Sequence, residues 1–215
     1  MATRHSLLEQ TLAGRLVAII RLHEDADLLH VAEALAEGGV LALEFTLTTP
    51  GALAAIQAAR TRFGAGVVVG AGTVLDADSA RRCLDAGAQF LVSPGFDPAV
   101  VEVAHSQHAL AMPGALTPTE ILTAWRAGAD VIKIFPARQF GPRYIADIRA
   151  PLPDVPLMPT GGVDATNAAA FLEAGAVGVA VGGSLVDPTA VARHEWHAIA
   201  TRAALLVSAV RAAQF

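Results

Sequence analysis

One lysine lies in the middle of an apolar run, where a cation is unexpected. It is Lys133 in VIKIFPA, residues 131–137, and it is the only lysine among the 15 lysine and arginine residues of the chain. Burial disfavours the charged form of an amine and lowers its pKa. A neutral lysine amine can attack a ketone and form a Schiff base, which an always-protonated arginine cannot do. We therefore interpret Lys133 as a candidate nucleophile. The alternative is a strand residue whose stem packs while its amine reaches water.

A carboxylate occupies a similar position in an earlier apolar run. Glu44 lies in LALEFTL, residues 41–47. Burial raises the pKa of a carboxyl group toward neutral pH, where a general acid–base works best. Schiff-base chemistry on a keto acid needs a proton carrier for carbinolamine formation, for dehydration and for proton transfer at C3. Glu44 is our candidate for that role, and the alternative is a charge partner for a nearby arginine.

Two glycine-rich stretches close the last two apolar runs of the chain. They are PTGG, residues 159–162, and VGGS, residues 181–184. Glycine lets a phosphate approach backbone N–H groups, and barrel enzymes often bind phosphate at the loops after strands 7 and 8 and a short helix N-terminus. Ser184 would cap that helix and offer its hydroxyl. The pair of stretches predicts a phosphate site, although ordinary tight turns would have the same composition.

Three further motifs carry less chemistry. GAGT, residues 70–73, lacks the third glycine of a dinucleotide-binding fingerprint, so we interpret it as a tight strand exit that presents Thr73. Histidines three residues apart occur at 105–108 and 194–197. No carboxylate cluster accompanies either pair, so we expect surface histidines and no metal site. Cys83 lies in the middle of a predicted helix, and we expect it to be partly buried.

The elements that must position these side chains alternate regularly along the chain. Eight apolar runs, whose starts are roughly 20 to 25 residues apart, predict strands at 16–20, 41–47, 67–73, 90–95, 109–114, 131–136, 156–162 and 177–183. Helix-like segments lie between them at 25–37, 50–62, 77–86, 98–107, 117–127 and 164–174, and a last helix is expected over roughly 188–212. Glycines after several helices predict left-handed caps, and Thr117 to Glu120 predicts a capping box.

This alternation predicts an α/β fold with parallel strands, and eight units in 215 residues predict a single (β/α)8 TIM barrel domain over residues 1–215. Polar residues follow the carboxyl ends of many strands, and a barrel would bring those ends to one mouth. They are Arg21, Glu44, Thr73, Ser93, Lys133, Thr160 and Ser184. The alternative is an open doubly wound sheet, in which they would be spread along an edge.

Composition excludes several classes of protein. Hydrophobic residues make up 53% of the chain and charged residues 16%, which is unlike a disordered segment. The net charge of −5 argues against a nucleic-acid or anionic-membrane partner. No apolar run is long enough for a membrane-spanning helix, and no signal core is visible at the N-terminus. Cys83 is the only cysteine, so no internal disulfide can form. We expect a cytoplasmic protein.

Seven motifs together resemble one enzyme family. In chain order they are EGGVLALEFTL, VGAGTVL, FLVSPG, MPGALTPTE, IKIFPA, MPTGGV and VGGS, from residue 37 to residue 184. As a set they resemble the 2-keto-3-deoxy-6-phosphogluconate (KDPG) aldolases and their relatives, and the resemblance runs over nearly the whole chain. These are class I aldolases with small trimeric barrels, and some also cleave 4-hydroxy-2-oxoglutarate. The resemblance implies cleavage of a phosphorylated keto acid to pyruvate and glyceraldehyde 3-phosphate, with no metal or other cofactor, in a homotrimer.

The resemblance also implies roles for individual residues. Lys133 would form the Schiff base and Glu44 would be the general acid–base. Thr73 would bind the pyruvate carboxylate, and Pro94 and Phe135 would line that pocket. The remaining positions would hold the far hydroxyl groups and the phosphate: Thr160, Gly161, Gly162, Gly182, Gly183 and Ser184.

One position departs from the family pattern. KDPG aldolases commonly carry the stretch E-x-T-L-R-T, whose arginine grips the substrate carboxylate, and here Thr48 stands in its place. Arg21 ends the preceding strand and is the candidate to supply the missing charge. The stretch FGPRYI, residues 140–145, also resembles phosphogalactonate-cleaving relatives. The sugar acid therefore stays open between a phosphogluconate-derived, a phosphogalactonate-derived and a non-phosphorylated substrate.

Two rival functions remain on the residues alone. One is a phosphate-binding barrel isomerase or synthase without a Schiff base, which would keep full activity in Lys133→Arg. The other is a catalytically inactive barrel retained as a binding module. The presence of both Lys133 and Glu44 argues against the second rival.

Overall fold

A computed structural model gives the fold and describes residues 3–23 and 26–213. Its strands are all paired in parallel within two sheets. Their bounds are β1 Leu16–Ile20, β2 Ala42–Thr46, β3 Val68–Gly72, β4 Phe90–Val92, β5 Leu110–Met112, β6 Gly114–Ala115, β7 Ile132–Ile134, β8 Leu157–Pro159 and β9 Val179–Val181. Each of the eight apolar runs contains at least one of these strands, so the strand predictions are confirmed. Strand β1 matches its run at both ends, β6 extends one residue beyond its run, and most other ends lie one to three residues inside the predicted ones.

The order of the strands follows the chain. The larger sheet has the order β5-β4-β3-β2-β1-β9, and the smaller one has the order β6-β7-β8. In the larger sheet, β1 to β5 lie side by side in chain order, and β9, the last strand of the chain, pairs with β1, the first, with Val17 opposite Ala180. The fold is a parallel α/β arrangement with a six-stranded half-barrel sheet.

Two short connections link the sheets. The predicted strand 109–114 is divided at Pro113, which has no N–H group to donate to a neighbouring strand. Its first part, β5, pairs with β4, and its second part, β6, pairs with β7 through Gly114 and Lys133. On the other side, an isolated parallel bridge joins Thr160 after β8 to Ala180 in β9.

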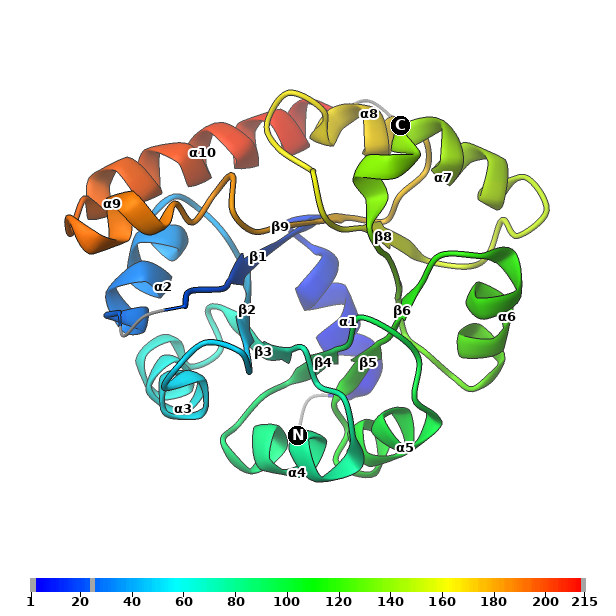
Figure 1. Cartoon of the computed structure of the whole chain (residues 1–215), viewed down its shortest axis with the longest axis horizontal. Helices are drawn as coiled ribbons and strands as arrows, with labels where there is room; N and C mark the ends of the chain where they lie inside the picture. The colour runs from blue at the N-terminus through cyan, green and yellow to red at the C-terminus, as the bar shows by residue number, and fades with distance from the viewer. Residues whose placement is uncertain (1–2, 24–25, 214–215) are drawn as a thin grey trace.

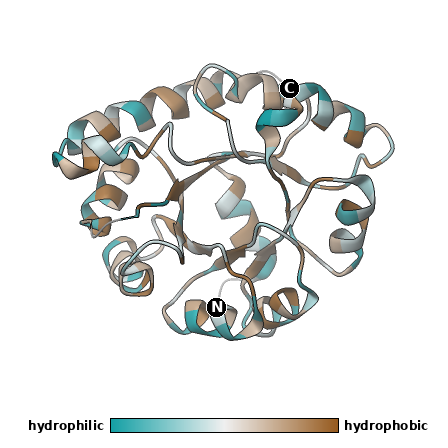
Figure 2. Ribbon diagram, in the orientation of Figure 1, coloured by the Kyte–Doolittle hydropathy of each residue, from teal (hydrophilic) through white to brown (hydrophobic). Residues whose placement is uncertain are grey.

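Alternate residues of the strands form one apolar interior. Inward-facing residues from both sheets belong to a single buried cluster: Val17, Ile19, Ala42, Val68, Phe90, Val92, Leu110, Met112, Val131, Met158 and Ala180. The residues between them, such as Leu43 and Phe45, face the helices in a second, larger cluster. This period of two is the geometry of a strand covered on both sides. Figure 2 shows the hydrophobic colour concentrated on the strands and the hydrophilic colour on the outer helix surfaces.

Helices surround the strands, and α1 lies behind their centre (Figure 1). The bounds are α1 Arg4–Leu12, α2 Leu28–Glu37, α3 Ala52–Phe63, α4 Ala77–Asp85, α5 Pro98–Ser106, α6 Pro118–Arg126, α7 Gly141–Arg149, α8 Ala168–Glu173, α9 Pro188–Ala192 and α10 Trp196–Ala212, with a short 3-10 helix η1 at Ala137–Gln139. Leu7 of α1 joins the interior cluster, so this helix covers one end of the apolar interior.

Local signals placed most helix ends correctly. Thr117 and Glu120 form the predicted capping box, with Pro118 as the first helical residue. Glycines with positive φ end several helices as predicted, for example Gly87 at 100° and Gly128 at 94°. The predicted start of the first of these helices at residue 25 lies outside the described residues, and α2 begins at Leu28 after the Asp27 cap.

Other helix predictions need correction. The expected helix over 188–212 is two helices, because the backbone at His194 takes a left-handed φ of 54° between α9 and α10. Helix α8 begins at Ala168 and not at 164, because the Asp164 side chain holds the preceding residues in a turn by accepting from Thr166. Helices α1 and α7 were not predicted from the sequence.

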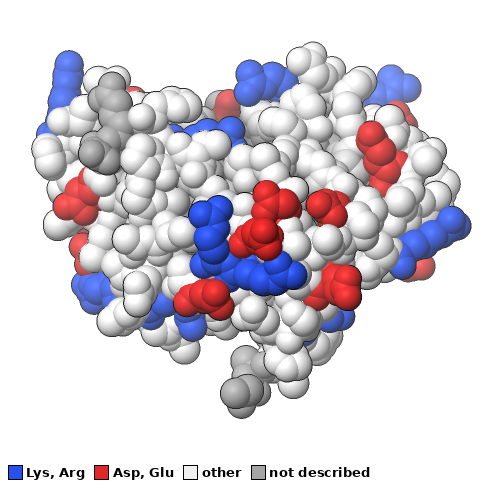
Figure 3. Space-filling model, turned by 60° about the horizontal axis from the view of Figure 1, so that its bottom comes forward, with Lys and Arg blue, Asp and Glu red and all other residues white. Residues whose placement is uncertain are grey.

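The surface carries charges of both signs. On the face shown in Figure 3, acidic and basic side chains are interspersed, and several of both signs lie next to one another near its centre. In the described ranges, no helix is both long and apolar enough to cross a membrane.

Of the paired histidines, His108, His194 and His197 are exposed as predicted, whereas His105 is half-buried against Asp130. Cys83 is completely buried, more than expected, and burial raises the pKa of its thiol to about 11.

Candidate active site

Glu44 and Lys133 are the most deeply buried charged side chains of the inner face. Glu44 lies on β2 and is 1% exposed, and Lys133 lies on β7 and is 5% exposed. Both belong to the inward-facing set, because their strand neighbours Phe45 and Ile132 face the helices. The two side chains, together with Thr160, line one small enclosed cavity in the interior. Residues separated by 89 positions in the sequence therefore meet inside the fold.

The Glu44 carboxylate has no hydrogen-bond partner among the described residues, and both of its oxygen atoms are buried. Buried polar groups are nearly always hydrogen-bonded, so an orphaned carboxylate marks a functional candidate. Burial raises the pKa of Glu44 above its ordinary value, and the positive charges of Lys133 and Arg21 act in the opposite direction. The group is therefore able to hold a proton at a pH where an exposed glutamate would be ionised.

Gly72 provides the space that the Glu44 carboxylate occupies. A methyl group added to Gly72 would lie 1.8 Å from Oε1 of Glu44, closer than any non-bonded contact permits. Gly72 ends β3, directly opposite Thr46 of β2. The glycine is thus required by the position of the carboxylate. The motif GAGT was interpreted from the sequence as a strand exit, and that interpretation missed this second role.

Lys133 has the electrostatic environment expected of a nucleophilic amine. Burial lowers the pKa of Lys133 below its ordinary value, the Glu44 carboxylate opposes this, and the charge of Arg21 lowers it further. Its Nζ lies 5.0 Å from the centre of the Phe135 ring. The neutral form of the amine is therefore easier to reach by deprotonation here than on the surface, as Schiff-base formation requires.

A cavity of about 460 Å³ opens above Lys133 at the carboxyl ends of the strands. Arg21 lines it from the end of β1, and its Nη2 donates a hydrogen bond of 3.1 Å to Oγ1 of Thr73. Thr73 follows β3 with φ of 60°, a left-handed conformation that is costly for a β-branched residue. The structure thus brings together the cation and the hydroxyl that the sequence analysis proposed for the substrate carboxylate.

The predicted phosphate loops line the same cavity. They contribute Thr160, Gly161, Gly162, Gly182, Gly183 and Ser184. The N–H groups of Gly162, Gly183 and Ser184 donate to no other residue within the described part of the chain. The predicted short helix after VGGS does not form, because Leu185 and Val186 both donate to the carbonyl of Gly182 in a turn. Ser184 caps no helix and instead donates its hydroxyl to the Val163 carbonyl at 3.0 Å.

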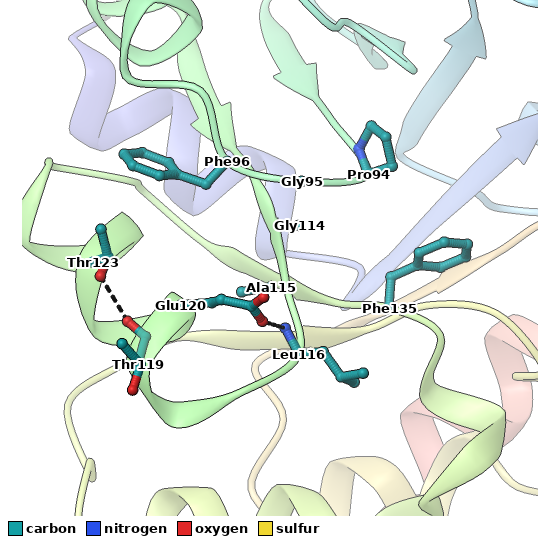
Figure 4. A pocket seen from close by; sticks show the side chains of 10 residues that line it. All are labelled: Pro94, Gly95, Phe96, Gly114, Ala115, Leu116, Thr119, Glu120, Thr123 and Phe135. Carbon is teal, nitrogen blue, oxygen red and sulfur yellow. Dashed lines mark hydrogen bonds between the residues drawn. The ribbon is translucent and has the colours of Figure 1, made fainter.

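Four predicted residues lie outside the lining of this cavity. Glu44 lines the small interior cavity that it shares with Lys133, and Thr73 is bonded to the lining residue Arg21, whereas Thr48 and Pro94 have neither link. Thr48 is exposed beyond β2, with its hydroxyl 3.2 Å from that of Thr46. Pro94 lines a neighbouring cavity of about 370 Å³ between the loops after β4 and β6, together with Phe96 and Leu116 (Figure 4). Phe135 lines both cavities and so stands between them. Of the predicted residues, Thr48 and Pro94 are therefore the two that neither line this cavity, nor share the interior cavity with Lys133, nor bond to Arg21.

Two charged residues of the mouth were not identified from the sequence. Arg138 and Asp164 line the same cavity as the glycine loops. Arg138 lies in the short helix η1 after β7 and Asp164 in the loop after β8, and neither belongs to a motif whose chemistry is apparent locally. Only the spatial arrangement of the loops after β7 and β8 reveals them.

The side chains of the described residues contain no group of three or more His, Cys, Asp or Glu that could hold a metal ion. His105 contacts Asp130 at 3.0 Å, which gives it a structural partner. The arrangement at the mouth instead offers an amine, a proton carrier, an arginine beside a hydroxyl, and backbone N–H groups. These define a parallel α/β enzyme equipped for covalent amine chemistry on an anionic carbonyl compound.

Comparison with known proteins agrees with this class. The model of the family described as KDPG and KHG aldolase matches residues 8–202. The chain therefore belongs to the KDPG and KHG aldolase family. It is 39% identical over 174 residues to a probable 2-dehydro-3-deoxy-6-phosphogalactonate aldolase of Rhizobium meliloti, covering 80% of this chain and 82% of the relative. It is 37% identical over 185 residues to a 2-dehydro-3-deoxy-phosphogluconate aldolase of Pseudomonas aeruginosa, covering 85% and 83%.

A solved structure shares the fold over almost the whole chain. The KDPG aldolase of Legionella pneumophila, solved with pyruvate captured as a covalent carbinolamine intermediate, superposes with a TM-score of 0.83. It is 27% identical and covers 95% of this chain and 98% of its own. The chain is thus an aldolase-family lyase by sequence and by fold.

Proposed function

We propose that the protein is a class I aldolase that cleaves 2-keto-3-deoxy-6-phosphogluconate to pyruvate and glyceraldehyde 3-phosphate. The observation that carries this proposal is the pair of buried side chains on the inner face. Glu44 is an unpartnered carboxylate and Lys133 is an amine whose pKa is lowered by burial. A structural role would leave both groups paired, whereas covalent catalysis needs them free.

The proposed reaction begins with attack of the Lys133 amine on the C2 ketone, which gives a carbinolamine and then, with loss of water, an iminium ion. Glu44 accepts the proton of the C4 hydroxyl as the C3–C4 bond breaks. The electron pair of that bond moves into the iminium, which becomes an enamine, and the aldehyde leaves. Glu44 returns the proton to C3, and water hydrolyses the iminium to release pyruvate and the free amine.

Two groups of residues hold the two charged ends of the substrate in this proposal. Arg21 and Thr73 bind the carboxylate, with the arginine supplying the charge that Thr48 does not. Thr160 and the glycine loops bind the far hydroxyl groups and the phosphate. The single cavity that Arg21, Lys133 and Ser184 all line supports this assignment.

A second candidate substrate is 2-keto-3-deoxy-6-phosphogalactonate. The 39% identity to the Rhizobium meliloti relative supports it, as does the sequence FGPRYI. The two sugar acids differ only in the configuration at C4. We also keep the non-phosphorylated 4-hydroxy-2-oxoglutarate as a substrate to be tested.

The architecture and assembly are proposed on the same basis. We infer that the two sheets are parts of one (β/α)8 barrel spanning residues 1–215. The continuity of β5 and β6 around Pro113 and the bridge between Thr160 and Ala180 support this inference. A homotrimer follows from the family resemblance alone, and a cytoplasmic location follows from the composition of the sequence; both stay predictions.

Reduction by borohydride in the presence of pyruvate tests the mechanism. Because Lys133 is the only lysine of the chain, any adduct on a lysine side chain can form only there, and peptide mapping separates it from the N-terminal amine. We expect a stable adduct on Lys133 in the native protein and none in Lys133→Met. Cleavage activity in Lys133→Met and in Lys133→Arg should fall by roughly 10,000-fold or more, as for other lost nucleophiles.

An unmodified Lys133, or full activity in Lys133→Arg, would contradict the Schiff-base mechanism and favour the isomerase or synthase rival. Loss of cleavage on addition of a metal chelator would also contradict it. Rates on the three candidate substrates, measured side by side, then decide which sugar acid the enzyme uses.

A further inference from the structure

Arg138 is a cation in the lining of the mouth cavity, and the sequence motifs assign it no role. It lies in η1, directly after β7, and lines the mouth cavity together with Gly161, Gly162 and Ser184. Its backbone N–H donates to the Gly161 carbonyl at 2.9 Å, which ties η1 to the first glycine loop. The position of the residue is therefore set by its main chain and does not depend on its side chain.

The Arg138 side chain lies directly over the glycine loop. A methyl group placed on Gly162 would be 2.5 Å from Cβ of Arg138 and 3.5 Å from its Nε. Gly162 itself has φ of 85°, so both its conformation and this close approach exclude a larger residue. The guanidinium group is exposed and forms neither a hydrogen bond nor an ion pair with any residue that the structure describes.

The charges that face the cavity leave this arginine available for an anion. Arg21 also lines the cavity, and its guanidinium group already donates to Thr73. Asp164 is the one carboxylate in the lining, and its Oδ1 accepts from both the N–H and the hydroxyl of Thr166. Backbone N–H groups alone would hold a phosphate beside this negative charge, and a nearby guanidinium would offset that repulsion.

We propose that Arg138 is a phosphate-binding residue that determines the preference of this enzyme for phosphorylated substrates. The inference rests on the proposed aldolase function and deepens it. A guanidinium presents several N–H donors in a fixed plane that matches phosphate oxygens, and such contacts are among the stronger hydrogen bonds. Arg138 and the N–H groups of Gly162, Gly183 and Ser184 would then contact the phosphate from two sides.

Binding of glycerol 3-phosphate, measured by calorimetry, tests the proposal without relying on catalysis. We expect Arg138→Ala to raise the Kd roughly tenfold or more, and Arg138→Lys to raise it less. The matched control is Arg143→Ala, because Arg143 lies in α7 with its side chain 91% exposed and does not line the cavity. It should bind like the native protein. Added salt should weaken binding less in Arg138→Ala than in the native protein.

Kinetics on two substrates separate this inference from the proposed function. With the phosphorylated sugar acid, Arg138→Ala should raise KM by about the same factor as it raises the Kd of glycerol 3-phosphate, and kcat should be nearly unchanged. With 4-hydroxy-2-oxoglutarate, which has no phosphate, and in borohydride trapping of pyruvate, the variant should match the native protein. A native Kd for glycerol 3-phosphate in Arg138→Ala, or an equal loss on both substrates, would overturn the role of Arg138. Absence of a pyruvate adduct in the native protein would instead overturn the aldolase proposal.

Discussion

Two buried carboxylate side chains lie in very different surroundings, one just before strand β7 and the other in the middle of strand β2. Asp130, just before β7, has a side chain 8% exposed and is fully engaged by three elements. Its Oδ1 contacts Nε of Arg4 in α1 at 3.1 Å, and its Oδ2 accepts from the Ala111 N–H at 2.8 Å and lies 3.0 Å from Nε2 of His105. Glu44 has only 1% of the whole residue exposed, both of its carboxylate oxygens are buried, and it has no hydrogen-bond partner among the described residues.

The difference separates structure from function. A buried carboxylate that is fully hydrogen-bonded stabilises the fold by joining elements, as Asp130 joins α1, α5 and β5. A buried carboxylate without partners costs stability, and the fold retains it only where its chemistry is used. Glu44 lies inside an apolar run and Asp130 directly before one, but the sequence does not show which of the two carboxylates has hydrogen-bond partners.

The largest expected effect on this comparison comes from removing the ionisable group of the unpartnered carboxylate, Glu44. Glu44→Gln should lower kcat/KM by roughly 100- to 10,000-fold, because the proton carrier is lost. The same change removes no hydrogen bond, so it should alter the free energy of unfolding less than a change at Asp130. Steady-state cleavage assays and denaturant titration on the same preparations measure both quantities.

Asp130→Ala is the matched variant. It should destabilise the protein by about 1–3 kcal/mol, because three partners lose their acceptor. It should retain kcat at a temperature where the fold is intact. If Asp130→Ala abolished catalysis in the folded state, or Glu44→Gln left activity intact, the distinction between the two carboxylates would be wrong.

A second variant displaces Glu44 without changing it. Gly72→Ala should lower kcat by roughly 100-fold, since the added methyl group occupies the space of Oε1. Gly95→Ala is the control, because a methyl group there meets no atom within 4 Å. Pyruvate trapping at Lys133 should persist in Gly72→Ala, which distinguishes a displaced proton carrier from a collapsed fold. Native kcat in Gly72→Ala would show that the carboxylate can act from another position.

The smallest expected effect is a shift in pH dependence. Burial lowers the pKa of Lys133 and the Glu44 carboxylate raises it. In Glu44→Gln the raising influence is gone, so the midpoint of the pH profile for amine trapping should move to lower pH. The charge of Arg21 lowers the pKa of Lys133, so Arg21→Met should move the same midpoint to higher pH. Trapping rates measured as a function of pH check both signs, and shifts in the same direction would contradict the assigned couplings.

Local sequence was sufficient for much of the framework. The eight strand positions and most helix ends were predicted correctly, because apolar periodicity, glycine caps and the capping box at Thr117 act over a few residues. The break at His194 was missed because nothing in its neighbourhood demands a left-handed residue. Helix α1 was missed because its apolar face becomes meaningful only against the interior that it covers.

The sequence by itself determined which residues are chemically unusual: one lysine and one glutamate inside apolar strands, and glycine loops at two consecutive strand ends. Only the tertiary structure decided how they are used. It placed Arg21 against Thr73, gave Gly72 the task of accommodating Glu44, moved Thr48 out of the mouth, and set Arg138 over Gly162. These relations join residues that are far apart in the chain. They depend on strand register and loop approach, which no local pattern encodes.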